Sequence, residues 1–461
     1  TIISGYSRSM KFIPSKIKQR FAALHSDHKR IARSAVWVSL FSLLGKLAGA
    51  AKEMAVAYRY GVSGVVDAYQ LAFTVVTWIP GTLVSVIGVV LIPILVRLRQ
   101  QDSKDRALFL EEMHGTVLIL GGLFMLVSVL LGPPALAYLA AGLSEETRQM
   151  ARQLIFGMAP VALLILTIKV LAARLQAQEK QVNTLLESMP AAAICGFILF
   201  WPKGAEIAPL LWGVLLGFVV QTAWLAYLAQ RADGQSFRFR WSWRSSHWPE
   251  FYQAVGVMAI GQFVMSFITP LDQYFAAQLG DSAIATLSYG NRLIALLNGL
   301  GSLAVSRATL PVFSEIAALG DWARARRMAL KWSGLMFAIG GGAAAVCWLT
   351  APWIIKLLFE RGAFTANDTV VVAAVFRWSL IQLPFYFSVL VLVQLMASCN
   401  RFGVMSIFAA TNFLVKLGFN LLLTPWMGIE GIALATSLMY SYSLSCFLGL
   451  VLWLDRERST E

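Results

Sequence analysis

Long apolar segments separated by short polar ones dominate the sequence of 461 residues. A bilayer core of about 30 Å requires roughly 20 apolar residues per helix, and the pattern predicts twelve membrane-spanning helices. Two of the segments are longer than a straight span and contain proline, so we expect those helices to bend. The predicted spans are 35–58, 66–97, 110–131, 153–173, 182–201, 208–230, 251–277, 283–316, 328–350, 370–396, 404–423 and 431–454.

The composition excludes most other classes of protein. Hydrophobic residues make up 58% of the chain and charged residues only 13%, whereas soluble domains carry about 25% charge. The four cysteines lie in apolar segments without the spacing of a metal site: Cys195, Cys347, Cys399 and Cys446. The sequence therefore predicts an all-α polytopic membrane protein without a metal site, and not a soluble enzyme or a disulfide-rich secreted module.

The distribution of basic residues predicts the orientation. The chain has 38 Lys and Arg against 24 Asp and Glu, a net charge of +14. With the N-terminus in the cytoplasm, 25 basic residues fall in inside segments, counting Arg97 and Lys331 at the cytoplasmic span ends; 6 fall in outside loops and 7 deeper within spans. This bias follows the positive-inside rule and predicts that both termini are cytoplasmic. We expect the tail 1–34 to contact anionic phospholipid, because it is rich in Lys and Arg and precedes the first span. It is not expected to be a signal peptide or to bind nucleic acid.

An internal repeat divides the chain into two halves. Matching positions recur at offsets of 218 to 224 residues: Gly61 with Gly280, Gly81 with Gly301, Pro93 with Pro311, and Pro160 with Pro384. Each repeat contains six predicted spans, so the two lobes share one orientation, and such parallel repeats place a substrate site between the lobes. The predicted organisation is an N-lobe at 35–230, a basic cytoplasmic linker at 231–250, a C-lobe at 251–454 and a cytoplasmic tail at 455–461.

Ionisable residues within the spans are the candidate functional residues. Each costs about 2.5–3.5 kcal/mol at the centre of a helix on insertion scales. Lys46, Lys52 and Arg292 lie near the middle of their spans and are predicted to bind substrate. Of the ten ionisable residues singled out here, seven are basic and three are acidic, which predicts an electropositive cavity and an anionic ligand such as a pyrophosphate group.

The other ionisable residues have simpler alternatives. Glu53, Asp67 and Asp272 are predicted as cavity acids or ion-pair partners; Asp67 could instead cap its own helix, and Asp272 could pair with a basic residue of the neighbouring lobe. Lys169, Arg307 and Lys416 lie near cytoplasmic ends, where long side chains reach the interface. Asn291 and Arg377 are further cavity candidates.

No catalytic constellation is recognisable. The four histidines are scattered and no nucleotide-binding glycine-rich loop is present, so the chain is not expected to be an enzyme or to hold a cofactor. A coupling ion is left open.

The first two predicted spans carry a recognisable motif. The segment 45–53 reads G-K-L-A-G-A-A-K-E and is followed by Tyr60-Gly61 and Asp67-Ala68. This resembles the S-R-x-x-G-x-x-R-D … F-G … D-A-F signature of the lipid II flippase (MurJ/MviN) family, part of the multidrug/oligosaccharidyl-lipid/polysaccharide (MOP) exporter superfamily. The segment 289–293, Y-G-N-R-L, is similar to the family's Y-A-D-R-L, and 358–365, L-F-E-R-G-A-F-T, to its L-F-x-x-G-x-F-T.

The resemblance runs from about residue 31 to 454 and implies a function. Members of this family are flippases of the bacterial inner membrane that move an undecaprenyl-pyrophosphate-linked saccharide outward by alternating access. Lys46, Lys52 and Arg292 stand where the family has cavity arginines, and Glu53 and Asp67 stand where it has aspartates. The family usually adds two C-terminal helices that are not among the twelve predicted here.

Three departures leave the cargo open. Two cavity arginines are lysines here, Asn291 replaces an aspartate, and Trp78–Thr82 occupies the place of an arginine pair in the second span. Lipid II and a related exopolysaccharide or O-antigen-type precursor are therefore both expected substrates. An ion-coupled antiporter of small organic cations and a non-transporting scaffold for envelope-synthesis proteins are the alternative functions.

Overall fold

The computed structural model describes residues 26–99, 103–180, 182–202, 207–319, 321–399 and 401–460, and the regular elements in these ranges are all α-helices. The helices are α2 (Ser26–Tyr60), α3 (Gly64–Leu98), α4 (Ser103–Leu139), α5 (Glu145–Met158), α6 (Pro160–Ala177), α7 (Val182–Leu186), α8 (Met189–Phe200), α9 (Ala208–Asp233), α10 (Trp248–Ser266), α11 (Ile268–Ala277), α12 (Ala283–Ala318), α13 (Trp322–Phe359), α14 (Ala366–Leu380), α15 (Gln382–Ser398), α16 (Phe402–Met427) and α17 (Ile429–Thr460).

Every predicted span coincides with one helix or with two consecutive helices. Within the described ranges, nine helical segments are long and apolar enough to cross a membrane, and the bent pair α10–α11 makes a tenth. The helices α2 and α12 are 35 and 36 residues long but are not among these ten. The all-helical membrane fold is confirmed, while the number of twelve spans stays a prediction.

The two halves share a characteristic break. In the first half the chain breaks between α5 and α6, where Pro160 occupies the first turn of α6. In the second half it breaks between α14 and α15, close to Pro384. Proline lacks an amide hydrogen and fits the first turn of a helix, so it separates two helical segments without an unsatisfied donor. This position is one of the matches on which the predicted repeat rests.

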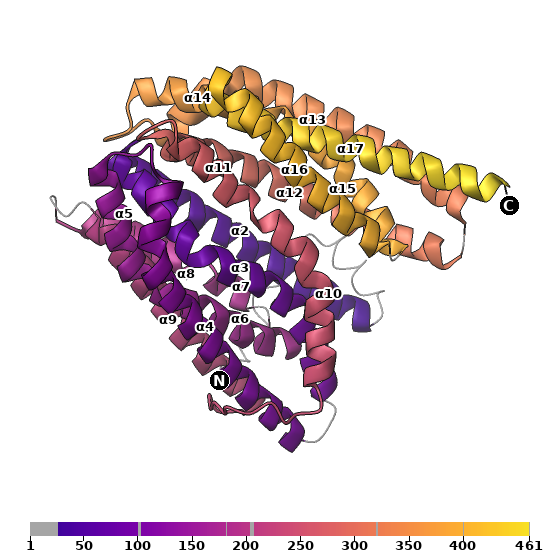
Figure 1. The fold of residues 1–461 in the computed structure, drawn as a ribbon. Coiled ribbons are helices and arrows are strands. Elements are labelled where there is room, and N and C mark those ends of the chain that lie inside the picture. Colours follow the sequence, from indigo (N-terminus) through magenta and orange to yellow (C-terminus); the bar gives the residue numbers. More distant parts are fainter. Residues whose placement is uncertain are drawn as a thin grey trace, which may run out of the picture.

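The hydrophobic core is shared at one end of the molecule and divided at the other. One large buried cluster joins residues of both halves, among them Val66, Leu154, Ala285 and Phe364. Two further clusters are separate: one is built from α3, α4, α6 and α10, the other from α12, α13, α15 and α17. Figure 1 shows α2–α9 in the lower part and α13–α17 along the top, with α11 and α12 between them and α10 running down the right-hand side. We call the end with the shared cluster the closed end, and the end with the two separate clusters the split end.

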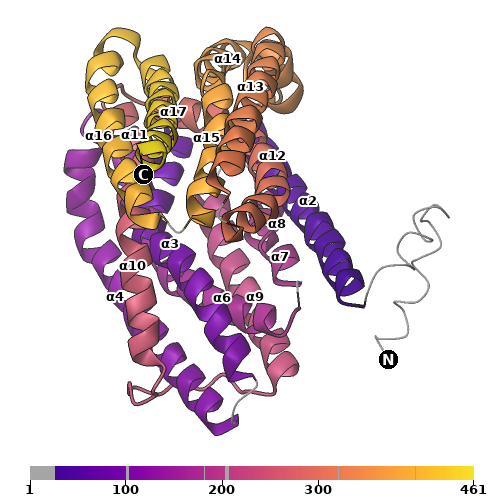
Figure 2. The same ribbon diagram turned by 90° about the vertical axis from the view of Figure 1, so that its right-hand side faces the viewer.

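The linker and the start of α10 lie with the first half of the chain. Trp248 and Phe251, in the first turn of α10, are buried in the cluster of α3, α4 and α6. The helix then runs beside α3, as Figure 2 shows from a second direction. Of the predicted N-terminal tail 1–34, residues 1–25 lie outside the described ranges, and the remainder belongs to α2, which begins at Ser26. The predicted C-terminal tail 455–461 is helical as far as Thr460, because α17 continues to that residue.

Candidate substrate cavities and the contacts that close them

A cavity of about 520 Å³ lies between α2, α7, α8 and α12, and we call it the cationic cavity. Lys46, Lys52 and Arg292 all line it, together with Glu53 and Glu187. The three basic residues predicted to bind substrate are therefore brought together by the fold. Three cations face two carboxylates, which gives this lining a net charge of +1.

Glu53 is the centre of an ion-pair triad. Its Oε1 lies 2.6 Å from Nζ of Lys52 and 2.9 Å from Nε of Arg292. Glu53 is only 7% exposed, whereas the Arg292 side chain is 45% exposed. A buried carboxylate requires such partners, because an unpaired charge is strongly destabilised away from water. The arginine uses its Nε for this bond. Its two terminal nitrogens can therefore make a bidentate contact with phosphate oxygens.

Lys46 lines the same cavity without an ion-pair partner among the residues that the structure describes. Its side chain is half-buried, and its Nζ lies against Gly299 of α12. Glu187 is a lining residue that the sequence analysis did not single out. The signal was available, because Glu187 is an acidic residue within the predicted span 182–201.

A second cavity, of about 640 Å³, lies between α3, α10, α11 and α12, and we call it the polar cavity. Amide and hydroxyl side chains line it: Gln70, Thr74, Thr77, Thr82, Ser85, Gln262, Ser266, Thr269, Gln273, Ser288 and Asn291. Trp78 donates from Nε1 to Oγ of Ser266 at 3.0 Å. Arg292 lines both cavities, so a ligand spanning them could contact it from either side. Uncharged donors and acceptors of this kind suit hydroxyl-rich and amide-rich groups.

Asp272 lines the polar cavity but is already paired with a lysine of its own half. Its Oδ1 lies 2.9 Å from Nζ of Lys416 and accepts from Nδ2 of Asn420 at 3.0 Å. Nζ of Lys416 also donates to the carbonyl of Ile432 at 2.8 Å and to Oγ1 of Thr436 at 2.6 Å. The suggestion that Asp272 pairs across the lobes was wrong. The suggestion that Lys416 reaches the interface was also wrong, because its side chain is 0% exposed.

Asp67 closes one end of the molecule and is not in either cavity lining. From α3 it accepts hydrogen bonds from the main-chain N–H groups of Ser282 and Ala285, the latter at 2.6 Å, at the start of α12. The first N–H groups of a helix lack internal partners and carry partial positive charge. Asp67 therefore caps the helix that follows in the other half. Neither of the roles predicted for it, as a cavity acid or as a cap of its own helix, describes this contact.

Further main-chain contacts hold the closed end together. Oη of Tyr289 donates to the carbonyl of Gly61 at 3.0 Å, and the N–H of Ala363 donates to the carbonyl of Tyr58 at 2.8 Å. Gly61 and Gly362 have φ of +58° and +63°, and a Cβ on either would run into the backbone of the opposite half. Glycine is needed at both positions, because it tolerates a positive φ and lets the two backbone segments approach closely.

Among the side chains that the structure describes, the remaining candidates do not line the cationic cavity. Nε of Arg377 donates to the carbonyl of Trp348 at 3.1 Å, and Arg377 lines neither cavity. Asn291 lines the polar cavity. Lys169 is half-buried with its side chain against Gly88 of α3, and the side chain of Arg307 lies outside the described part of the molecule.

Replacing Asp67 by Asn is expected to loosen the closed end. Two charge-assisted bonds to a helix N-terminus are worth about 1–2 kcal/mol, so the population with this end open should rise about tenfold. The measurement uses an Ala68→Cys variant in which the four native cysteines have been replaced. The protein is placed in nanodiscs, and the rate at which a water-soluble thiol reagent labels the cysteine at position 68 is determined. Ala68 is fully buried in the closed end.

Asp368→Asn is the matched control for this change. Asp368 also caps a helix, but only its own helix α14, through the capping box with Thr365. Its removal should leave the labelling rate unchanged. Equal labelling of the Ala68→Cys protein with and without Asp67→Asn would contradict the role of Asp67 in holding the closed end together.

Comparisons with known proteins agree with this architecture. A family model described as lipid II flippase MurJ matches residues 56–454. The probable lipid II flippase MurJ of Synechocystis sp. is 28% identical over 92% of this chain and 82% of its own length, and that of Bdellovibrio bacteriovorus is 24% identical over 90% and 80%.

Two solved structures have the same fold. The structure of lipid II flippase MurJ in an inward closed conformation matches with a TM-score of 0.77 at 20% identity, over 90% of this chain and 87% of that chain. The inward-facing structure of a multidrug resistance MATE family transporter of the MOP superfamily matches with a TM-score of 0.73 at 16% identity, over 90% and 95%. Since the family model covers most of the chain in one continuous match, this multi-pass membrane protein belongs to the lipid II flippase MurJ family.

Proposed function

We propose that this protein moves lipid II, or a closely related polyprenyl-pyrophosphate-linked saccharide, across the bacterial inner membrane. The observation that carries the proposal is the pair of adjoining cavities that share Arg292. The cationic cavity offers Lys46, Lys52 and Arg292 to a pyrophosphate, and the polar cavity offers amides and hydroxyls to a saccharide. The relatives described as probable lipid II flippases favour lipid II over other cargoes.

The proposed mechanism is alternating access between the two halves. The shared core and the Asp67 contacts hold the halves together at the closed end, while separate cores at the split end allow the halves to part there. The substrate would enter between the halves from the split end and neutralise the excess positive charge of the cationic cavity. Closure of the split end and opening of the closed end would then release it on the other side.

The proposed orientation puts the split end in the cytoplasm. Basic residues at the end of α3, in the first turns of α4, between α9 and α10 and in the first turns of α13 all lie at this end, and positive segments are retained inside. Lipid-linked precursors are then taken from the inner leaflet, and both termini are cytoplasmic.

The test is depletion of this protein in its own host, with polyprenyl-linked intermediates quantified by mass spectrometry. We expect lipid II to accumulate several-fold, since translocation would become the slow step. A matched strain depleted of an unrelated membrane protein controls for slowed growth. Accumulation of a different pyrophosphate-linked saccharide would correct the cargo, and no accumulation at all would overturn the proposal.

An organic-cation antiporter has weaker support from the site. Such a transporter needs acidic groups free to bind a cation, but Glu53 is paired with Lys52 and Arg292, and Asp272 with Lys416. Glu187 shares its cavity with three basic residues, which disfavours a cationic ligand there. Overproduction of the protein is therefore expected to leave susceptibility to cationic drugs unchanged. A clear rise in multidrug resistance would favour the antiporter.

A further inference from the structure

The linker between α9 and α10 is fixed to the first half by a buried carboxylate. Glu112 of α4 is 0% exposed. It accepts from Oγ of Ser242 at 2.6 Å, from the N–H groups of Arg244 and Ser245 at 2.8 and 3.1 Å, and from Nε1 of Trp248 at 2.7 Å. Four donors on one carboxylate make a strong attachment, because each bond is charge-assisted and shielded from water.

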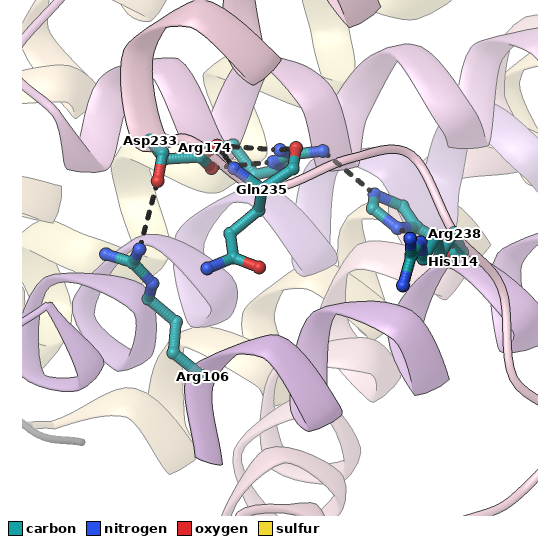
Figure 3. A network of polar contacts seen from close by, with 6 residues as sticks. All are labelled: Arg106, His114, Arg174, Asp233, Gln235 and Arg238. Carbon is teal, nitrogen blue, oxygen red and sulfur yellow. Dashed lines mark hydrogen bonds and ion pairs between the residues drawn. The ribbon is translucent and has the colours of Figure 1, made fainter. Parts of the chain in front are cut away.

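A second network fixes the start of the linker (Figure 3). Arg174 of α6 binds both carboxylate oxygens of Asp233 at 2.8 Å and donates to the carbonyl of Gln235 at 2.6 Å. Nδ1 of His114 lies 3.0 Å from the carbonyl of Arg238, and Arg106 donates to the carbonyl of Asp233 at 3.0 Å. The segment 235–245 is therefore an ordered part of the split end, and we call it the linker strap.

The strap alternates aromatic and basic residues along its sequence. Phe237, Phe239, Trp241 and Trp243 occupy the odd positions, and the even positions include Arg238, Arg240 and Arg244. The anchoring bonds use mainly backbone atoms and Ser242, so the aromatic and basic side chains stay exposed; Trp241 is 72% exposed.

The position of the strap along α4 puts it at the depth of lipid headgroups. The apolar part of α4 runs from 117 to 139 and is about 35 Å long at 1.5 Å per residue, enough for a hydrocarbon core of about 30 Å. The strap contacts α4 just before this segment: the N–H of Arg240 donates to the carbonyl of Glu111 at 2.9 Å, and Nε1 of Trp243 donates to Oγ1 of Thr116 at 2.9 Å.

We propose that the linker strap binds anionic phospholipid of the leaflet at the split end. Exposed Trp and Phe are favoured at the boundary between headgroups and acyl chains, and arginines beside them match the phosphates of anionic lipids. Arg238 and Arg244 supply this charge, since neither has an ion-pair partner among the described residues, whereas Arg240 faces Glu111 at 3.5 Å. Because the strap is tied to α4 and α6, bound lipid would hold the first half in the membrane while the other half moves. This inference does not depend on the cargo.

The test is a lipid titration of the purified full chain followed by native mass spectrometry, with dioleoyl-phosphatidylglycerol against dioleoyl-phosphatidylcholine. The variant is Arg238→Gln together with Arg244→Gln, which removes two charges and keeps the backbone groups that anchor the strap. At about 1 kcal/mol for each basic residue near an anionic surface, the preference for phosphatidylglycerol should fall about 10- to 30-fold. High salt should reduce the preference of the unaltered protein in the same direction.

The matched control is Arg324→Gln together with Arg327→Gln. These exposed arginines lie in the first turns of α13, at the split end of the other half, and removing them changes the net charge equally. This control should keep the lipid preference. A third variant, Trp241→Ala, should weaken binding of both lipids alike, because the ring contributes apolar contact and no charge.

Two results would overturn the proposal. One is an unchanged phosphatidylglycerol preference in the variant without Arg238 and Arg244. The other is an equal loss in the α13 control, which would mean that net charge alone attracts the lipid. A preference for a soluble acidic protein over phosphatidylglycerol vesicles, measured by co-sedimentation, would reassign the strap to a protein partner. Circular dichroism and gel filtration of each variant show whether it is folded, so a loss of binding can be separated from misfolding.

Discussion

Replacement of Arg292 by Ala is expected to lower the translocation rate about 100-fold with the protein level unchanged. Arg292 is the residue that lines both cavities, and it keeps two terminal nitrogens beyond its bond to Glu53. Hydrogen bonds to charged groups contribute about 1.5–3 kcal/mol each, and 1.4 kcal/mol corresponds to a factor of ten. The protein should still fold, because the side chain is 45% exposed and Glu53 keeps Lys52 as a partner.

Arg292→Lys separates charge from geometry. Lysine keeps the positive charge but lacks the planar fork that binds two phosphate oxygens at once. We therefore expect an intermediate rate, clearly above that of Arg292→Ala. If charge alone mattered, the lysine variant would be fully active. Positions 46 and 52 are lysines, so Arg292 supplies the one guanidinium group among the three basic residues predicted to bind substrate.

The measurement is complementation of the depleted host, with lipid-linked intermediates and protein level determined in the same culture. Arg327→Ala is the control, because Arg327 is exposed at the start of α13 and lines neither cavity. Lys46→Ala should resemble Arg292→Ala, since Lys46 is the cation of the cationic cavity without an ion-pair partner in the described residues. Full activity of both variants would refute the assignment of this cavity.

Lys416→Met is expected to lower the free energy of unfolding by about 3–5 kcal/mol. Removing one member of a buried ion pair leaves the other charge without compensation. Here the ammonium is 0% exposed. Its loss removes the ion-pair partner of the Asp272 carboxylate and the donor to the oxygens of Ile432 and Thr436. The expected result is a lower yield of folded protein and a lower midpoint in thermal unfolding followed by gel filtration in detergent.

A double variant tests the cause of this loss. Lys416→Met with Asp272→Asn removes both charges, and stability should recover by a large part of the deficit, because the two residues are coupled. Lys169→Met is the matched control: it removes a lysine that is half-buried and has no ion pair within the described ranges, so it should cost much less. If Lys416→Met unfolds at the midpoint of the unaltered protein, the pair has no structural role.

Sequence and structure agree best where a property depends on the number and spacing of apolar residues. Every predicted span coincides with a helix or a helix pair, since a segment of about 20 apolar residues in lipid must satisfy its backbone internally. The clustering of Lys46, Lys52 and Arg292 was also predictable in kind. Charged residues at mid-span are too costly to face lipid, so they converge on one another.

Partners of individual charges were not predictable. Asp67 and Asp272 both look like acids within or beside a span, yet Asp67 binds the start of a helix 215 residues away and Asp272 binds a lysine of its own half. Glu112 is also an acidic residue within a predicted span, 110–131, but its partners could not be predicted, because its four donors come from residues more than 100 positions further along the chain. A carboxylate accepts from any donor that the fold supplies, and spacing in the sequence does not say which.

By itself the sequence determined that the chain is helical, crosses a membrane, carries its positive charge in particular loops and resembles one flippase family. These properties are local, since hydropathy, turn residues and motifs act over a few turns of helix. The tertiary structure decided which buried charges neutralise each other, which end of the molecule is closed, and that the linker is fixed to α4 and α6. These properties depend on contacts between distant segments, where a difference of a few ångströms decides whether two groups form an ion pair.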